Sequence, residues 1–191
     1  MKLLITGFEP FGGDAVNPSW EAVQALPEQI GQYQLHKLRL PVVFGKAAEM
    51  AVAEAERLQA DAVLAIGLAG GRRAVTPEVV AINLRDAGIP DNAGLQPHDE
   101  PIAPGAPAAY FATLPVRAMK DAIRAADIPA MLSYSAGVYV CNDLMYSLLH
   151  HFAGTQVRCG FMHVPYLPDM GTPSLPLEKI TAAVKAAVET L

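Results

Sequence analysis

The chain has 191 residues, a net charge of −5 and a hydrophobic content of 52%. This length suits one α/β domain over residues 1–191, and a charged fraction of only 17% excludes a disordered chain. The acidic balance argues against nucleic acid or an anionic membrane as a partner. No apolar stretch is long enough to span a bilayer, and glycine and proline interrupt the N-terminal region before a signal-peptide core can form, so we expect a cytoplasmic location.

Strands and helices alternate along most of the chain. Taken in order, the hydrophobic patterns predict a strand over residues 2–6, a helix over 18–26, a strand over 34–40, a helix over 44–59, strands over 62–66 and 79–84, a helix over 116–126, a strand over 130–135, a helix over 142–152, a strand over 157–164 and a helix over 177–190. This order predicts a largely parallel sheet with helices on both faces, which binds ligands beyond the carboxyl ends of its strands. The Pro-rich residues 94–105 form a long loop of the kind that is functional or interfacial.

Cys141 lies where an apolar run gives way to a helical pattern. A thiol in the first turn of a helix meets free backbone N–H groups and the positive end of the helix dipole, and both favour the nucleophilic thiolate. The chain has one other cysteine, Cys159, and two buried thiols in a reducing compartment are the more common explanation of such a pair. No Cys-X-X-Cys motif and no Cys/His cluster with zinc spacing occurs, so we expect neither a metal nor a cofactor.

His163 and Glu78 can complete a catalytic site around Cys141. A cysteine hydrolase needs a His to exchange the proton, usually a third group to orient that His, and donors for the oxyanion. Ordinary structural roles explain each residue at least as well when it is taken alone. His163 can be a hydrogen-bonded His at the end of a strand, and Glu78 can be a solvated carboxylate at the start of one. Phe8 and Phe11 lie on a Gly-bounded loop, where they line a flat apolar pocket or fill the core beneath the loop.

Sequence blocks along nearly the whole chain resemble the pyroglutamyl peptidase I (pyrrolidone-carboxylate peptidase) family of cysteine peptidases. Their number and common order make a chance resemblance very unlikely. The blocks are Gly7–Gly13, Asn17–Trp20, Gly70–Arg72, Thr76–Glu78, Ala81–Asn83, Ile89–Asn92, Gly105–Tyr110, Ser135–Gly137, Val140–Asn142 and His163–Pro168.

The resemblance implies a three-layer α/β/α sandwich around a twisted, largely parallel mixed sheet. It also implies a thioester-forming exopeptidase that removes N-terminal pyroglutamate, needs no metal or cofactor, and assembles as a homo-oligomer, a dimer or tetramer. Cys141 matches the nucleophile, His163 the base and Glu78 the orienting acid. The positions that match the substrate pocket are Phe8, Phe11, Asn17, Leu68, Ile89, Tyr139 and Val140.

Three positions depart from the family pattern. Gly88 replaces an Arg that lies near the oxyanion site, and the nearby Arg85 is a candidate replacement for it. Leu68 replaces a common Gln, a change that is tolerable if the residue acts through its backbone. Asp143 replaces a His after Cys-Asn, and an added anion so close to Cys141 opposes thiolate formation. These departures bear on rate and pH optimum more than on reaction type.

Other functions stay open from the residues alone. A related α/β/α transferase that uses phosphate is one, although the Gly70–Arg73 turn lacks the spacing and the Lys of a phosphate-binding P-loop. Another is a catalytically silent binding protein, which keeps the pocket but has lost its catalytic rate. A redox-sensing thiol is the third, and it predicts oxidation of Cys141 without peptide hydrolysis.

Overall fold

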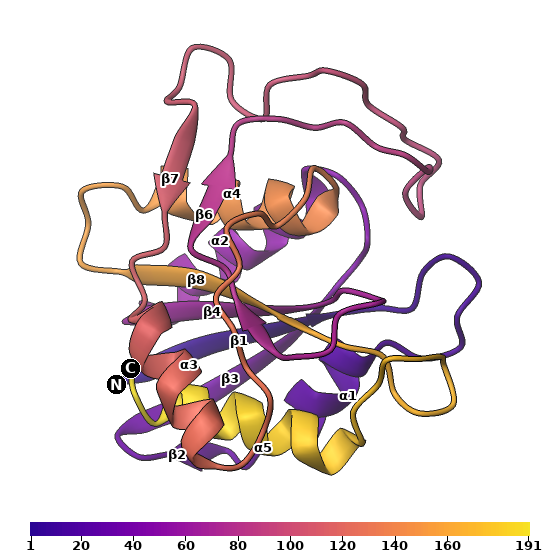
Figure 1. Cartoon of the computed structure of the whole chain (residues 1–191). Coiled ribbons are helices and arrows are strands. Elements are labelled where there is room, and N and C mark those ends of the chain that lie inside the picture. Colours follow the sequence, from indigo (N-terminus) through magenta and orange to yellow (C-terminus); the bar gives the residue numbers. More distant parts are fainter.

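The computed structural model describes residues 1–191 and has five helices on two faces of a central sheet (Figure 1). The helices are α1 (Pro18–Ala25), α2 (Lys46–Leu58), α3 (Val116–Ala125), α4 (Val140–His151) and α5 (Leu177–Val188). The strands are β1 (Lys2–Phe8), β2 (Gln29–Ile30), β3 (Tyr33–Leu40), β4 (Ala62–Leu68), β5 (Thr76–Pro77), β6 (Val80–Ile82), β7 (Ala109–Phe111) and β8 (Arg158–Val164). None of the helices has both the length and the hydrophobicity that a membrane crossing requires.

The main sheet is mixed, with a parallel centre. Its six strands run in the order β2-β3-β1-β4-β8-β5, and the four central strands are parallel to one another. The short edge strands β2 and β5 pair antiparallel to their neighbours. Strands β6 and β7 form a separate antiparallel pair. The predicted largely parallel mixed sheet is confirmed.

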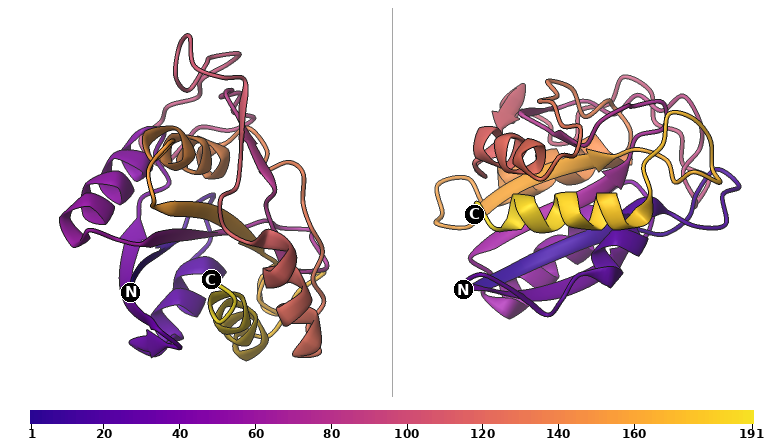
Figure 2. Two further views of the ribbon diagram at one scale, coloured as in Figure 1. Left: turned by 90° about the vertical axis from the view of Figure 1, so that its left-hand side faces the viewer. Right: turned by 60° about the horizontal axis from the view of Figure 1, so that its bottom comes forward.

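Helices cover both faces of the sheet (Figure 2), and each face carries its own hydrophobic core. Alternate residues of a strand point to opposite faces. Leu3 and Ile5 of β1 therefore pack in a core with α1, α3 and α5, whereas Leu4 and Phe8 pack in a second core with α2 and α4. The α/β/α sandwich is thus confirmed. In β8, Phe161 belongs to the core on the α4 side. His163 follows two residues later, so its side chain lies on the same side of the sheet.

One predicted strand is wrong and another is shortened. Residues 130–135 run beside β5 but form only isolated bridges, at Ala130 and Ser133. Proline has no N–H to donate, so Pro77 interrupts the hydrogen-bond ladder between the two segments. The strand predicted over residues 79–84 is ordered as β6 only over Val80–Ile82, where it leaves the main sheet to pair with β7.

Candidate active site

One cavity lies at the carboxyl ends of the parallel strands, next to the start of α4. Phe8, Leu68 and His163 come from the ends of β1, β4 and β8, and Cys141 comes from α4. The cavity has a volume of about 410 Å³. It is lined by Phe8, Phe11, Asn17, Val42, Leu68, Ala69, Arg72, Ser135, Ala136, Gly137, Tyr139, Val140, Cys141 and His163. Nine of these 14 residues are hydrophobic, which suits a flat, uncharged ligand.

Cys141 is the second residue of α4, as the helical pattern predicts. The backbone N–H groups of Val140, Cys141 and Asn142 have no protein acceptor, so they face the cavity end of the helix as free donors. Gly67 gives the thiol its room: a Cβ at Gly67 would lie 3.0 Å from Cys141 Sγ and only 2.6 Å from the Phe161 ring. Because Gly67 pairs with His163 across β4 and β8, the sulfur lies next to the residue of β4 that pairs with His163.

Glu78 contacts His163 from the neighbouring edge of the sheet. His163 Nδ1 lies 2.7 Å from Glu78 Oε1, and both side chains are almost completely shielded from solvent. The backbone fixes this approach, because Glu78 N–H donates to the Phe161 carbonyl and Thr76 pairs with His163. With Nδ1 committed to Glu78, Nε2 is the ring nitrogen that is left to exchange a proton with a thiol.

Burial sets the resting protonation of the three groups. It raises the pKa of the Cys141 thiol from 9.0 to about 12, a rise that Glu78 increases and Arg72 opposes. Burial also lowers the pKa of His163 below its usual range, and Glu78 offsets only part of that effect. For Glu78, burial raises the pKa, but the bond and charge of His163 outweigh it with help from Ser133 and Arg72, so the net pKa is lowered. The resting site therefore holds a neutral thiol, a neutral imidazole and a carboxylate.

Aromatic rings form one wall of the cavity. Phe11 and Phe44 flank Tyr139, with ring centroids 6.3 Å and 5.3 Å from it. Phe8 packs 6.5 Å from Phe161, so it both lines the cavity and belongs to the core. The sequence left these two roles of Phe8 as alternatives, and the residue fills both.

Asn17 lines the cavity, but its amide is engaged within the protein. Asn17 Nδ2 donates to the Glu9 carbonyl, and its Oδ1 accepts from the backbone and hydroxyl of Ser19. Asn17 thus caps α1 and holds the loop that carries the two aromatic residues. Leu68 and Val140 line the cavity too, whereas Ile89 is half exposed and is not part of its lining.

The expectation that Asp143 adds an opposing anion beside the thiol is wrong. Asp143 is fully buried, and its two oxygens accept from Arg85 at 2.6 Å and from the Gly45 N–H at 2.8 Å. Because Arg85 neutralises it, Asp143 is not among the causes of the raised pKa of Cys141. The same contact commits Arg85, which does not line the cavity and so does not stand in for an arginine at Gly88.

Sequence-based assignment of the site missed six lining residues: Val42, Ala69, Arg72, Ser135, Ala136 and Gly137. Of these, Arg72 and Ser135 contact each other. They lie 63 positions apart, and their contact depends on how the segment after residue 130 runs beside β5. The only local signal was their place inside two of the sequence blocks quoted above, Gly70–Arg72 and Ser135–Gly137.

Comparison with known proteins gives one consistent result. A model of the family described as pyroglutamyl peptidase matches residues 1–191. The chain is 50% identical to a pyrrolidone-carboxylate peptidase of Levilactobacillus brevis, over 98% of each chain, and 47% identical to pyrrolidone-carboxylate peptidase 1 of Photorhabdus laumondii, over 97% of this chain and 90% of that one. Among solved structures, pyroglutamyl peptidase I of Bacillus amyloliquefaciens superposes with a TM-score of 0.95 at 44% identity, covering 99% of this chain and 95% of that one.

Proposed function

The chain belongs to the pyroglutamyl peptidase family and is a cysteine-type omega peptidase that removes N-terminal pyroglutamate; on that premise we propose that Cys141, His163 and Glu78 carry its chemistry. The observation that supports this assignment is the buried Glu78–His163 hydrogen bond of 2.7 Å beside a thiol at the start of a helix. A base aligned by a carboxylate next to a nucleophile is the arrangement that acyl transfer needs.

Catalysis begins when a substrate carbonyl enters the cavity. His163 Nε2 takes the Sγ proton as Cys141 attacks the pyroglutamyl carbonyl carbon, and the free N–H groups at the start of α4 stabilise the oxyanion. The C–N bond then breaks, and His163 returns the proton to the departing amine. Water hydrolyses the resulting thioester, releases pyroglutamate and restores the thiol.

Specificity follows from the apolar lining of the cavity. Pyroglutamate is a flat, neutral lactam, and the wall formed by Phe8, Phe11 and Tyr139 suits such a ring. An ordinary N-terminal residue would carry an ammonium group into this wall, and removing that charge from water costs far more than burying a lactam. We propose that Leu68 and Val140 complete the ring site and that Asn17 acts by holding the aromatic loop.

Hydrolysis of a pyroglutamyl fluorogenic amide by the wild type and by Cys141→Ser tests the assignment, with a prolyl amide as the control substrate. We expect the wild type to cleave only the pyroglutamyl compound, and the variant to lose at least about 10³-fold in kcat because a hydroxyl is a far weaker nucleophile here. Retention of activity by Cys141→Ser would refute the assignment of the nucleophile.

We also propose that residues 1–191 act as one catalytic domain in the cytoplasm, and as a homo-oligomer. Both cysteines are free thiols, a state that suits a reducing compartment. Phe111, Tyr134 and Met131 are 72%, 63% and 54% exposed, and such large apolar side chains at a surface suit an interface between copies of the chain.

A further inference from the structure

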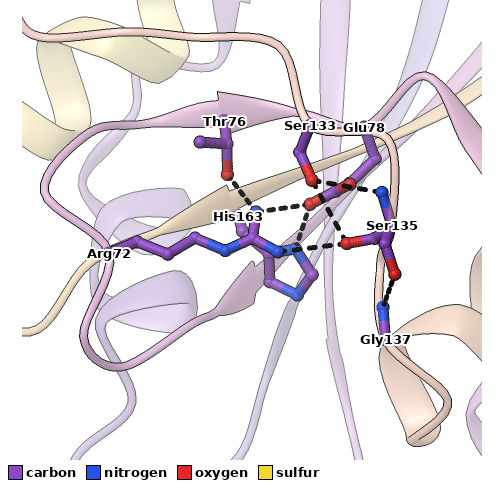
Figure 3. Close-up of polar contacts among 7 residues, drawn as sticks. All are labelled: Arg72, Thr76, Glu78, Ser133, Ser135, Gly137 and His163. Carbon is purple, nitrogen blue, oxygen red and sulfur yellow. Dashed lines mark hydrogen bonds and ion pairs between the residues drawn. The ribbon is translucent and has the colours of Figure 1, made fainter.

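Arg72 links Glu78 to Ser135, which lines the cavity (Figure 3). Its Nη1 donates to Glu78 Oε1 at 2.6 Å and to Thr76 Oγ1 at 2.5 Å, and its Nη2 donates to the Ser135 carbonyl at 3.2 Å. Oε1 is the same Glu78 oxygen that lies 2.7 Å from His163 Nδ1. One planar guanidinium thus spans the β5 strand, the catalytic carboxylate and the segment after Ser133.

The segment that Arg72 reaches is itself part of the cavity. Ser135, Ala136 and Gly137 line it, and Ser135 Oγ accepts from the Gly137 N–H at 3.2 Å. Ser133 Oγ also donates to the Ser135 carbonyl, so this carbonyl accepts from two side chains. Arg72 therefore fixes Glu78 and the adjoining wall relative to each other.

The charge balance of the site depends on the same side chain. Glu78 is fully buried, and a buried carboxylate needs a positive partner. Arg72 is the only Lys or Arg among the cavity-lining residues, and it stays charged at every pH of interest. The other ionisable groups that face Glu78 are His163 on β8 and Cys141 on α4, with Tyr139 beyond Cys141.

Without Arg72 the site has two ways to balance the charge of Glu78, and both impair His163 as a base. Glu78 can take up a proton, which ends its acceptor role toward His163 Nδ1. Alternatively, His163 can take up a proton to pair with Glu78, which leaves no free Nε2 to receive the thiol proton.

We propose that Arg72 is a positioning residue of the catalytic array, which keeps Glu78 ionised and aimed at His163 so that the imidazole rests neutral. The proposal builds on the peptidase function assigned above. Arg72 acts through Glu78 and not on the substrate, so its loss should change kcat and the pH profile while leaving KM nearly constant.

Two substitutions separate the charge of Arg72 from its geometry. Arg72→Met keeps the aliphatic length without the charge, and Arg72→Lys keeps the charge without the fork. We expect kcat for a pyroglutamyl amide at pH 7 to fall about tenfold to a hundredfold in Arg72→Met, with KM within about twofold of wild type. The acid limb of kcat/KM should move to higher pH in Arg72→Met and stay near its wild-type position in Arg72→Lys, whose kcat should be intermediate.

A second measurement does not depend on turnover. The His163 ring signal is followed by NMR against pH in the intact wild type and both variants, and is assigned by its absence in His163→Asn. Removal of the guanidinium should move the His163 midpoint to higher pH, because the Arg72 charge lowers the pKa of this imidazole. The Lys variant should titrate near the wild type.

The outcomes are distinct. A raised KM with unchanged kcat and pH profile would make Arg72 a substrate-binding residue and overturn the proposal. An equal loss of activity in both variants with an unmoved His163 midpoint would make its role purely structural and overturn it too. If the wild type fails to cleave the pyroglutamyl amide, the assigned function fails, while the NMR midpoints still decide whether Arg72 controls His163.

Discussion

Two thiols with raised pKa values, the buried Cys159 and the partly buried Cys141, make the stability of the protein sensitive to alkali. Burial raises the pKa values of Cys141 and Cys159 from 9.0 to about 12. Both thiols stay protonated in the folded state while they ionise in the unfolded chain, so the stabilisation is fully present below pH 9 and is lost as the pH rises toward 12. Each thiol should contribute a slope of up to about 1.4 kcal/mol per pH unit in that range.

Cys159→Ala isolates one of these two contributions. Urea unfolding between pH 8 and pH 11 should show a free energy of unfolding that falls less steeply with pH in the variant than in the wild type. The small cavity left by the substitution should lower the whole curve by about 1 kcal/mol without changing its slope. Parallel curves for the two proteins would contradict the expectation.

At the scale of elements, the Asp143–Arg85 pair ties α4 to two loops. Asp143 lies in the first turn of α4, next but one to Cys141, and it also accepts from the N–H of Gly45 at the start of α2. Asp143→Ala should therefore destabilise the fold by about 2–4 kcal/mol, because it leaves a partly buried guanidinium and a backbone donor without their acceptor. Chemical denaturation measures the change.

Arg85→Ala is the matched control for that prediction. The Arg85 side chain is 22% exposed, whereas Asp143 is fully buried. The two single variants and the double variant together give the coupling energy of the pair. An additive double variant would show that the pair does not act as a unit.

The aromatic wall is held by a second link between elements. Asn92 Nδ2 donates to Glu9 Oε1 at 2.8 Å and to the Pro10 carbonyl at 3.0 Å, and this fastens the loop between Phe8 and Phe11 to the start of the long Pro-rich segment. Asn92→Ala should loosen Phe11 and raise KM for a pyroglutamyl amide about three- to tenfold, with kcat within about twofold.

Gln96→Ala provides the comparison for Asn92→Ala, because Gln96 lies on the same segment and bonds only to the Ala87 carbonyl. Its steady-state constants should match those of the wild type. A fall in kcat without a change in KM in Asn92→Ala would instead place Asn92 in the chemistry of the site.

Sequence patterns predicted the elements that bury a regular set of their own apolar residues. All five helices and the central strands β1, β3, β4 and β8 lie where periodicity placed them, because each buries one regular stripe or a continuous apolar run. The two-residue strands β2 and β5 and the short β7 were missed, since they form only through pairing with distant segments. Their existence is a tertiary effect that no local pattern encodes.

The site shows the same division. Cys141 and His163 could be found as residues with their own chemistry at the ends of predicted elements, and Glu78 became specific only through the family resemblance. The link of Arg72 to Ser135, and the engagement of Asp143 by Arg85, depend on contacts across 63 and 58 positions. Such pairings are visible only in the folded chain.

At the scale of the whole molecule, the exposed apolar side chains predict self-association. Light scattering at about 10 μM should give a mass that is a multiple of the 20.3 kDa chain. Phe111→Glu should shift the mass toward the single chain, because a charge replaces a ring that is 72% exposed on β7. Phe111→Leu, which keeps the position apolar, should retain the assembly. A wild type that scatters as a single chain would rule out the oligomer.

The resting state of Cys141, the proposed nucleophile, has a consequence for the resistance of the enzyme to oxidation. Peroxides attack thiolates and react slowly with thiols, and burial keeps Cys141 protonated between turnovers. In the proposed mechanism, Cys141 is a thiolate only during the brief interval in which His163 holds its proton, when bound substrate fills the cavity and obstructs an oxidant. Oxidation of Cys141 should therefore be slow in the idle molecule, where the thiol is protonated, and also during turnover, where bound substrate shields the sulfur.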